Sequence, residues 1–118
     1  MSRDAVQARR PLNGALVPVL CAQAPGTVVH TTDFGNATKA AFADEVTLIL
    51  ENLLAGAELA TITITGGAPL VVSVPAQSTL EVLVGQPIMA QPDGTARAVT
   101  VAAANLNAIV AFGWFQRG

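Results

Sequence analysis

The stretch Thr61-Ile62-Thr63-Ile64-Thr65 alternates strictly between threonine and isoleucine. Successive side chains of a β-strand point to opposite faces, so this stretch predicts a strand with one apolar face and one hydroxylated face. Such a strand covers a core on one side and meets water on the other, which is typical of an antiparallel sheet. The rest of the chain is interpreted outward from this strand.

Short runs of apolar and β-branched residues recur along the chain, separated by turn residues such as Ala24-Pro25-Gly26, Gly66-Gly67 and Pro92-Asp93-Gly94. About eight short strands are expected, and Gly85-Gln86-Pro87 is expected to close one of them before a short edge segment. The expected segments are Ala15–Ala22, Thr27–Thr31, Glu45–Glu51, Glu58–Thr65, Leu70–Val74, Leu80–Val84, Ile88–Met89, Arg97–Ala103 and Ala108–Phe115. This pattern predicts an all-β, antiparallel β-sandwich that is jelly-roll-like.

One domain is expected, because 118 residues are too few for a second core. Residues 1–14 carry Arg3, Arg9 and Arg10 but little apolar periodicity, so they are expected to form an extended N-terminal arm. The sandwich domain is expected to span residues 15–118. Either the arm is a frayed tail, or its guanidinium groups bind carboxylates on a neighbouring acidic surface.

The segment over residues 45–54 fits two secondary structures. A helix would gather one apolar stripe, made of Phe42, Val46, Ile49, Leu50, Leu53 and Leu54. The β-branched residues of this segment favour a strand instead, and Asn52 is a turn residue placed directly after it. We therefore predict a strand over Glu45–Glu51 that returns through a hairpin loop, Leu53–Ala57, into the antiparallel strand Glu58–Thr65.

The composition is poor in charge, with 52% apolar and only 12% charged residues, about half the usual charged share. So few charges suggest that neighbouring molecules cover part of the surface. The net charge of −2, the pI near 5.1 and the six basic residues argue against a nucleic-acid partner. No export signal is evident, and no stretch of about 18 residues is apolar enough to span a membrane, so no membrane partner is expected.

No catalytic constellation is visible in the chain. Function through binding is therefore expected, with no enzymatic activity, cofactor or metal. Cys21, the only cysteine, lies in an apolar run and is expected to be a buried structural thiol and not a nucleophile. His30, the only histidine, has no second histidine or carboxylate pair at ligand spacing, so a packed or surface position is expected for it. The strand glutamates form no pair fixed in a cleft.

Outward positions of the expected strands also carry apolar side chains. In each of three strands, one branched residue is expected to point outward when its neighbours face the core. Ile49 points outward if Val46, Leu48 and Leu50 face the core. Val71 does so if Leu70, Val72 and Val74 face the core, and Leu83 does so if Leu80, Val82 and Val84 face the core. If they are contiguous, these three outward residues suit an interface between subunits. If they are scattered, they are ordinary surface residues.

The last expected strand concentrates most of the aromatic area. Its two faces are Val110, Phe112 and Trp114 on one side, and Ile109, Ala111, Gly113 and Phe115 on the other. Core packing is one interpretation of the aromatic residues. The other is that Trp114 and Phe115 anchor the chain on a partner.

Three segments carry a resemblance to a known family. The strand Val46-Thr47-Leu48-Ile49-Leu50-Glu51-Asn52 ends in asparagine, the segment from Ala57 to Ile64 contains the alternating threonines, and Val74-Pro75-Ala76-Gln77-Ser78-Thr79 forms a turn. Together, over residues 45–84, they resemble the small β-sandwich virion proteins of tailed bacteriophages. The resemblance implies a capsid decoration or cement protein, commonly a trimer at the junctions between capsomers.

A decoration protein on the capsid surface of the virion would have the major capsid protein and further copies of itself, as a homotrimer, for partners. The expected contacts with the shell are Arg3, Arg9, Arg10, Trp114 and Phe115. The expected contacts between copies are Ile49, Val71 and Leu83. One alternative is a tail, spike or neck component. Another, from a different class, is a small glycan- or ligand-binding β-sandwich module.

Overall fold

The computed structural model describes residues 10–12, 19–32, 43–89, 91 and 95–117. Over these residues the chain forms β-strands joined by turns and loops, with no α-helix. The strands are β1 (Arg10–Pro11), β2 (Val19–Leu20), β3 (Thr27–Thr31), β4 (Ala43–Asn52), β5 (Glu58–Ile64), β6 (Leu70–Val74), β7 (Thr79–Met89), β8 (Ala98–Ala103) and β9 (Ile109–Arg117).

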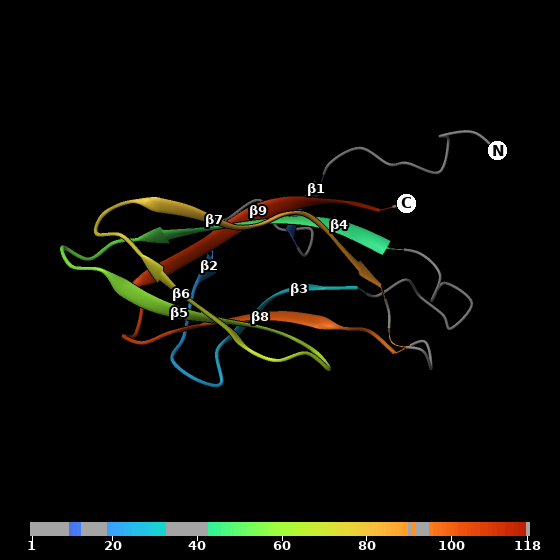
Figure 1. Ribbon diagram of the computed structural model, residues 1–118, viewed down its shortest axis with the longest axis horizontal. Helices are drawn as coiled ribbons and strands as arrows, with labels where there is room; N and C mark the ends of the chain where they lie inside the picture. The colour runs from blue at the N-terminus through green and yellow to red at the C-terminus, as the bar shows by residue number, and fades with distance from the viewer. Residues whose placement is uncertain (1–9, 13–18, 33–42, 90, 92–94, 118) are drawn as a thin grey trace.

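Two antiparallel sheets face each other (Figure 1). Sheet A has the order β1-β9-β4-β7, with β2 also paired to β9, and sheet B has the order β3-β8-β5-β6. The pairing is nested along the chain, since β2 pairs with β9, β3 with β8, β4 with β7 and β5 with β6. The described chain is therefore all-β, with the two packed antiparallel sheets expected of a β-sandwich.

Strand β4 lies inside sheet A, between β9 and β7, and it resolves the ambiguity of residues 45–54 in favour of a strand. Val46, Leu48 and Leu50 are all fully buried, at every second position, so this face of β4 lies against sheet B. Ile49, between them, is only half-buried on the outer face. The period of two, and not the helical stripe, is the pattern that the fold uses.

The core lies between the sheets. The isoleucine face of the Thr-Ile stretch is directed into it, since Ile62 is 2% exposed and Ile64 packs against the buried residues, while Thr61 and Thr63 are half-buried on the outer side. The predicted division of this strand into an apolar and a hydroxylated face is confirmed. The fully buried apolar core residues include Cys21, Val46, Leu48, Leu50, Val74, Val99, Val101 and Ile109.

The loop after β4 does not form the expected hairpin. Strand β4 belongs to sheet A and β5 to sheet B, so Leu53–Ala57 crosses from one sheet to the other. The side-chain amide of Asn52 explains the crossing, because its Nδ2 donates to the carbonyl oxygens of Gly56, at 2.8 Å, and Val74, at 3.0 Å, at the end of β6 in sheet B. The hairpin within sheet B is the next one, β5–β6, which turns at Gly66-Gly67.

Strand β7 also differs from expectation, because it continues through Gly85-Gln86-Pro87 to Met89. Proline lacks an amide donor, but β7 has a partner on only one side in the described part of sheet A, so its edge tolerates Pro87. Gly85 has a positive φ of 58° and donates its amide to the hydroxyl of Thr47 at 3.0 Å. The glycine therefore bends the strand and does not end it.

The irregular register of β7 changes the direction of Leu83 and Val84, whereas Leu80 and Val82 pack against the core as predicted. From Gln86 to Glu81, β7 contains two more residues than the stretch of β4 that pairs with it. Each extra residue of a β-bulge shifts the alternation of faces by one position. Leu83, expected to point outward, is half-buried against the core, whereas Val84, expected to point inward, is 71% exposed.

The two short N-terminal strands lie along β9. Arg10 and Pro11 pair with the end of β9, and β2 pairs with its beginning. Of the arm expected over residues 1–14, the structure describes only Arg10, Pro11 and Leu12, and the first two belong to sheet A. The strand expected over Ala15–Ala22 is described only from Val19 onward. The expected turn at Pro92-Asp93-Gly94 lies outside the described residues.

Candidate functional site

A buried histidine–aspartate pair is the contact that most resembles a chemical site. Nε2 of His30 lies 2.7 Å from Oδ2 of Asp44, and the two side chains are 1% and 0% exposed. His30 comes from β3 in sheet B and Asp44 from β4 in sheet A, so the pair joins the sheets through the core. The imidazole also packs against the ring of Phe115, with 4.3 Å between the ring centroids.

This pair has the groups of an acid–base dyad but no access to a substrate. A general acid or base must reach the atom that it protonates, and both side chains are sealed inside the core. Every buried side-chain nitrogen or oxygen of the described residues has a hydrogen-bond partner, so none is left for a ligand. His30 is therefore a packed histidine, one of the two positions predicted for it. Its partner was not predicted, because Asp44 is 14 residues away and lies on the other sheet.

Cys21 is a buried structural thiol, as predicted. Its side chain is 0% exposed. Burial raises the pKa of the Cys21 thiol from 9.0 to about 11, against the opposing effect of a backbone hydrogen bond from Ala111. The thiol is therefore protonated near neutral pH, where a nucleophilic cysteine needs to be a thiolate.

Glu58 is a second buried acid, and it holds a loop in place. Its Oε2 accepts the backbone N–H of Asn105 at 2.6 Å, and its Oε1 accepts the side-chain amide of the same residue at 2.8 Å. The carboxylate, which is 3% exposed, thus fixes the loop between β8 and β9 to the start of β5. Both acceptor oxygens are used within the fold, which leaves Glu58 a structural role.

The outer face of sheet A carries apolar side chains beside carboxylates. In the register of β4 and β9, Ile49 lies opposite Phe112 and Glu51 lies opposite Val110. We call this apolar group the aromatic stripe; it consists of Leu20, Ile49, Val110, Phe112 and Trp114. The stripe is bordered by Glu45 and Glu51 on β4 and by Glu81 on β7. An apolar centre with a charged rim is the arrangement of many protein interfaces.

The outer face of sheet B has no charged side chain in the described residues. The only ionisable residues of its four strands, His30 and Glu58, are buried. We call this surface the uncharged face; it consists of Val28, Leu59, Thr61, Thr63, Val71, Ser73, Thr100 and Ala102. The exposed fractions of Val28, Leu59 and Val71 are 46%, 53% and 59%. Four strands thus offer an apolar and hydroxylated surface without a single charge.

The structure describes three of the five expected shell contacts, Arg10, Trp114 and Phe115. Arg3 and Arg9 lie outside the described residues, and Arg10 is exposed on β1. Trp114 is half-buried on the aromatic stripe. Phe115 is 4% exposed and packs on His30, so it is a core residue and cannot anchor the chain on a partner.

The expected contacts between copies do not form one continuous face. Ile49 lies on the outer face of sheet A and Val71 on the outer face of sheet B, on opposite sides of the sandwich. Leu83 packs against the core because of the β7 bulge. Leu70, expected inward, is 46% exposed, whereas Val74 is fully buried as expected.

Within the described ranges, no group of three or more histidine, cysteine, aspartate or glutamate residues is placed to hold a metal ion. The same part of the chain has no helix with the length and apolar character needed to cross a membrane. In comparisons with known proteins, no family model, curated protein or solved structure matches the chain.

Proposed function

We propose that this chain is a capsid decoration protein of a tailed bacteriophage, which binds the outer surface of the shell at capsomer junctions and stabilises it. The observation that carries the proposal is the uncharged face of sheet B. A free monomer would expose this whole face to water, although the surfaces of soluble proteins usually mix both signs of charge. Depletion of charge is instead a mark of the centre of a protein interface.

The strand order supports the proposal at the level of the fold. We assign the sandwich to the jelly-roll class, because its strands pair in nested order, first with last and so on to the β5–β6 hairpin. Jelly rolls consist of two four-stranded sheets and recur in viral capsid domains, lectin domains and cupins. The fold alone does not determine function, so the two outer faces carry the rest of the proposal.

The uncharged face is the proposed contact between copies. Val71 is 59% exposed on β6, the edge strand of sheet B, with Thr61 beside it in the register, and Leu59 and Val28 are exposed further along. Threonine and valine on a pleated surface pack well against another flat surface. We propose a homotrimer, as in the phage proteins that the sequence resembles.

The aromatic stripe is the proposed contact with the major capsid protein. Trp114 and Phe112 are half-buried and supply large rigid apolar area, which is typical of the residues that dominate binding energy. Glutamates at the border of the stripe would favour a basic region of the shell over an acidic one. Arg3, Arg9 and Arg10 are proposed to bind carboxylates of a neighbouring subunit.

The proposed mechanism is adhesive. A copy at each junction adds buried surface where neighbouring shell subunits would separate, and several copies joined to one another bind with higher avidity than one. No chemical step is required. The protein would oppose outward pressure on the shell through contact area alone.

Substitution of Val71 by lysine (V71K) tests the uncharged face. The change places one charge on this face, at its most exposed large apolar residue, while V84K makes the same change at a residue that is 71% exposed on the β7 bulge. Both variants would be titrated onto shells stripped of the native protein and measured by co-sedimentation. We expect V71K to bind at least tenfold more weakly than wild type and V84K to bind as wild type does.

Circular dichroism and thermal melting would establish that both variants are folded. If V71K binds the shells as tightly as V84K and also self-associates as wild type does in sedimentation velocity, the uncharged face is not an interface. If the wild-type protein does not bind stripped shells at all, the decoration function is wrong.

A further inference from the structure

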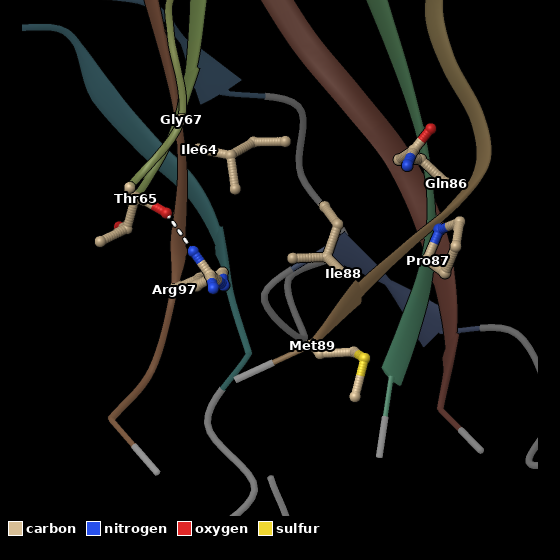
Figure 2. A pocket seen from close by; sticks show the side chains of 9 residues that line it. Ile64, Thr65, Gly67, Gln86, Pro87, Ile88, Met89 and Arg97 are labelled. Carbon is tan, nitrogen blue, oxygen red and sulfur yellow. Dashed lines mark hydrogen bonds between the residues drawn. The ribbon is translucent and has the colours of Figure 1, made fainter. Parts of the chain in front are cut away.

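A hollow of about 390 Å³ lies at the end of the sandwich where the β5–β6 turn meets the second half of β7 and the start of β8 (Figure 2). Neither outer face described above includes it. Its walls are mainly apolar, with Ile64 on one side and Pro87, Ile88 and Met89 on the other. Its one charged residue is Arg97, whose guanidinium group points between these walls.

Arg97 is held firmly by its surroundings. Its backbone N–H donates to Oγ1 of Thr32 at 2.9 Å, and its carbonyl oxygen accepts the backbone N–H of Thr32 at 2.9 Å. One nitrogen of the guanidinium, Nη1, donates to the carbonyl oxygen of Thr65 at 2.5 Å. Gly66 leaves the space that this group occupies, since a Cβ at Gly66 would lie 2.9 Å from Nη1. The guanidinium is thus fixed in position before any ligand arrives.

Most of the hydrogen-bonding capacity of Arg97 remains available. A guanidinium has five N–H donors, and the bond to Thr65 uses one of them. No carboxylate of the described residues lies within ion-pair distance of the Arg97 guanidinium. A half-buried cation with no anionic partner among the residues that the structure describes, beside an apolar wall, is complementary to a ligand that brings both a negative charge and an apolar body.

We propose that this hollow binds a small amphiphilic carboxylate. The planar guanidinium matches the two oxygens of a carboxylate in bidentate geometry, and the single cation suits a monoanion. The apolar body would lie against Ile64, Ile88 and Met89. The volume is near the lower end of the range of about 300–1,000 Å³ found for ligand pockets, so the body is short. This inference does not depend on the capsid function.

Met89 provides a direct reporter for the test. The chain has only two methionines, Met1 and Met89, so the ε-methyl spectrum of protein labelled with [methyl-¹³C]methionine has two signals, and an M89L variant assigns them. Hexanoate would be titrated into the full chain, with hexan-1-ol and hexylammonium as neutral and cationic ligands of the same length. We expect hexanoate to shift the Met89 signal in a saturable manner, with at least tenfold weaker binding of the alcohol and the amine.

The variant R97Q removes the charge, and R10Q removes a charge from β1, outside the lining of the hollow. We expect R97Q to weaken hexanoate binding at least tenfold and R10Q to leave it unchanged. Equal binding of hexanoate to wild type and R97Q would overturn the proposal, as would the absence of any Met89 shift up to the solubility limit. If R97Q does not fold, the comparison of the three ligands on wild type decides, and equal binding of hexanoate and hexylammonium would overturn the proposal.

Discussion

Removal of the Asp44 carboxylate by alanine substitution (D44A) is expected to lower the free energy of unfolding by about 1–3 kcal/mol, the usual cost of leaving a buried hydrogen-bonding group without its partner. The carboxylate is 0% exposed and lies 2.7 Å from Nε2 of His30, which is 1% exposed. The variant would take this acceptor away from an imidazole that water does not reach. For a domain with a total stability of roughly 5–15 kcal/mol, the loss is a large fraction.

The substitution H30A removes more than the hydrogen bond. It also deletes the ring that packs on Phe115, with 4.3 Å between the ring centroids. We therefore expect H30A to be at least as destabilising as D44A. The isosteric D44N retains an acceptor oxygen for His30, so its cost should be smaller, about 1–2 kcal/mol.

A double-mutant cycle of H30A, D44A and H30A/D44A isolates the contact itself. Urea unfolding would be followed by far-ultraviolet circular dichroism and by the fluorescence of Trp114, the only tryptophan. We expect a coupling energy of about 1.5–3 kcal/mol, as for hydrogen bonds to charged groups. A coupling energy below about 0.5 kcal/mol, within the additivity of independent sites, would refute the claim that this pair joins the two sheets.

Three further predictions concern single residues. A Cβ at Gly113, whose φ is +146°, would overlap the carbonyl oxygen of Thr47, so G113A should lose about 3 kcal/mol or more of stability in thermal melts. The control G56A has open space around its Cβ and should lose less than about 1 kcal/mol. Equal losses of stability in the two variants would contradict this prediction. Below pH 9 the Cys21 thiol is protonated in both the folded and the unfolded state, but between pH 9 and about 11 it ionises only in the unfolded state. The free energy of unfolding should therefore fall by about 1.4 kcal/mol per pH unit in this range. The C21A variant should abolish that slope. The side-chain amide of Asn52 donates to the carbonyl oxygens of Gly56 and Val74, and an aspartate carboxylate cannot donate. The N52D variant should therefore lose roughly 2–4 kcal/mol of stability and match N52A in urea unfolding. A wild-type urea midpoint for N52D would exclude these hydrogen bonds.

Local patterns in the sequence were sufficient to locate most of the longer strands and several of their inward faces. The alternation of Val46, Leu48 and Leu50 identifies the buried face of β4, and that of Ile62 and Ile64 identifies the buried face of β5. These predictions succeed because a strand repeats every two residues, a signal contained within each segment.

Tertiary contacts decided what local patterns could not. A loop such as Leu53–Ala57 suits either a hairpin or a crossing between sheets, and the bonds of Asn52 to residues more than twenty positions away favour the crossing. Gly85 looks like a strand end but accommodates a bulge, which turns Leu83 inward and Val84 outward. The sequence of β7 alone does not indicate this change of side-chain direction, because the change depends on the register between β7 and β4.

The candidate site was the least predictable part of the molecule. The partner of His30 comes from the other sheet, and no local spacing marks it. Arg97 was expected only as the first residue of a strand, and its hollow arises where the β5–β6 turn approaches β7. Two of the three expected interface residues, Ile49 and Val71, are outward as predicted, but the sheet assignment of their strands places them on opposite faces.

The number of copies per particle tests the capsid function most directly. This 12.0 kDa chain would be quantified by mass spectrometry in gradient-purified particles, relative to the major shell subunit. A decoration protein at capsomer junctions predicts one copy per shell subunit or a simple fraction of that ratio. A handful of copies per particle would contradict decoration and indicate a tail or neck component, and absence from the particles would contradict a virion role altogether.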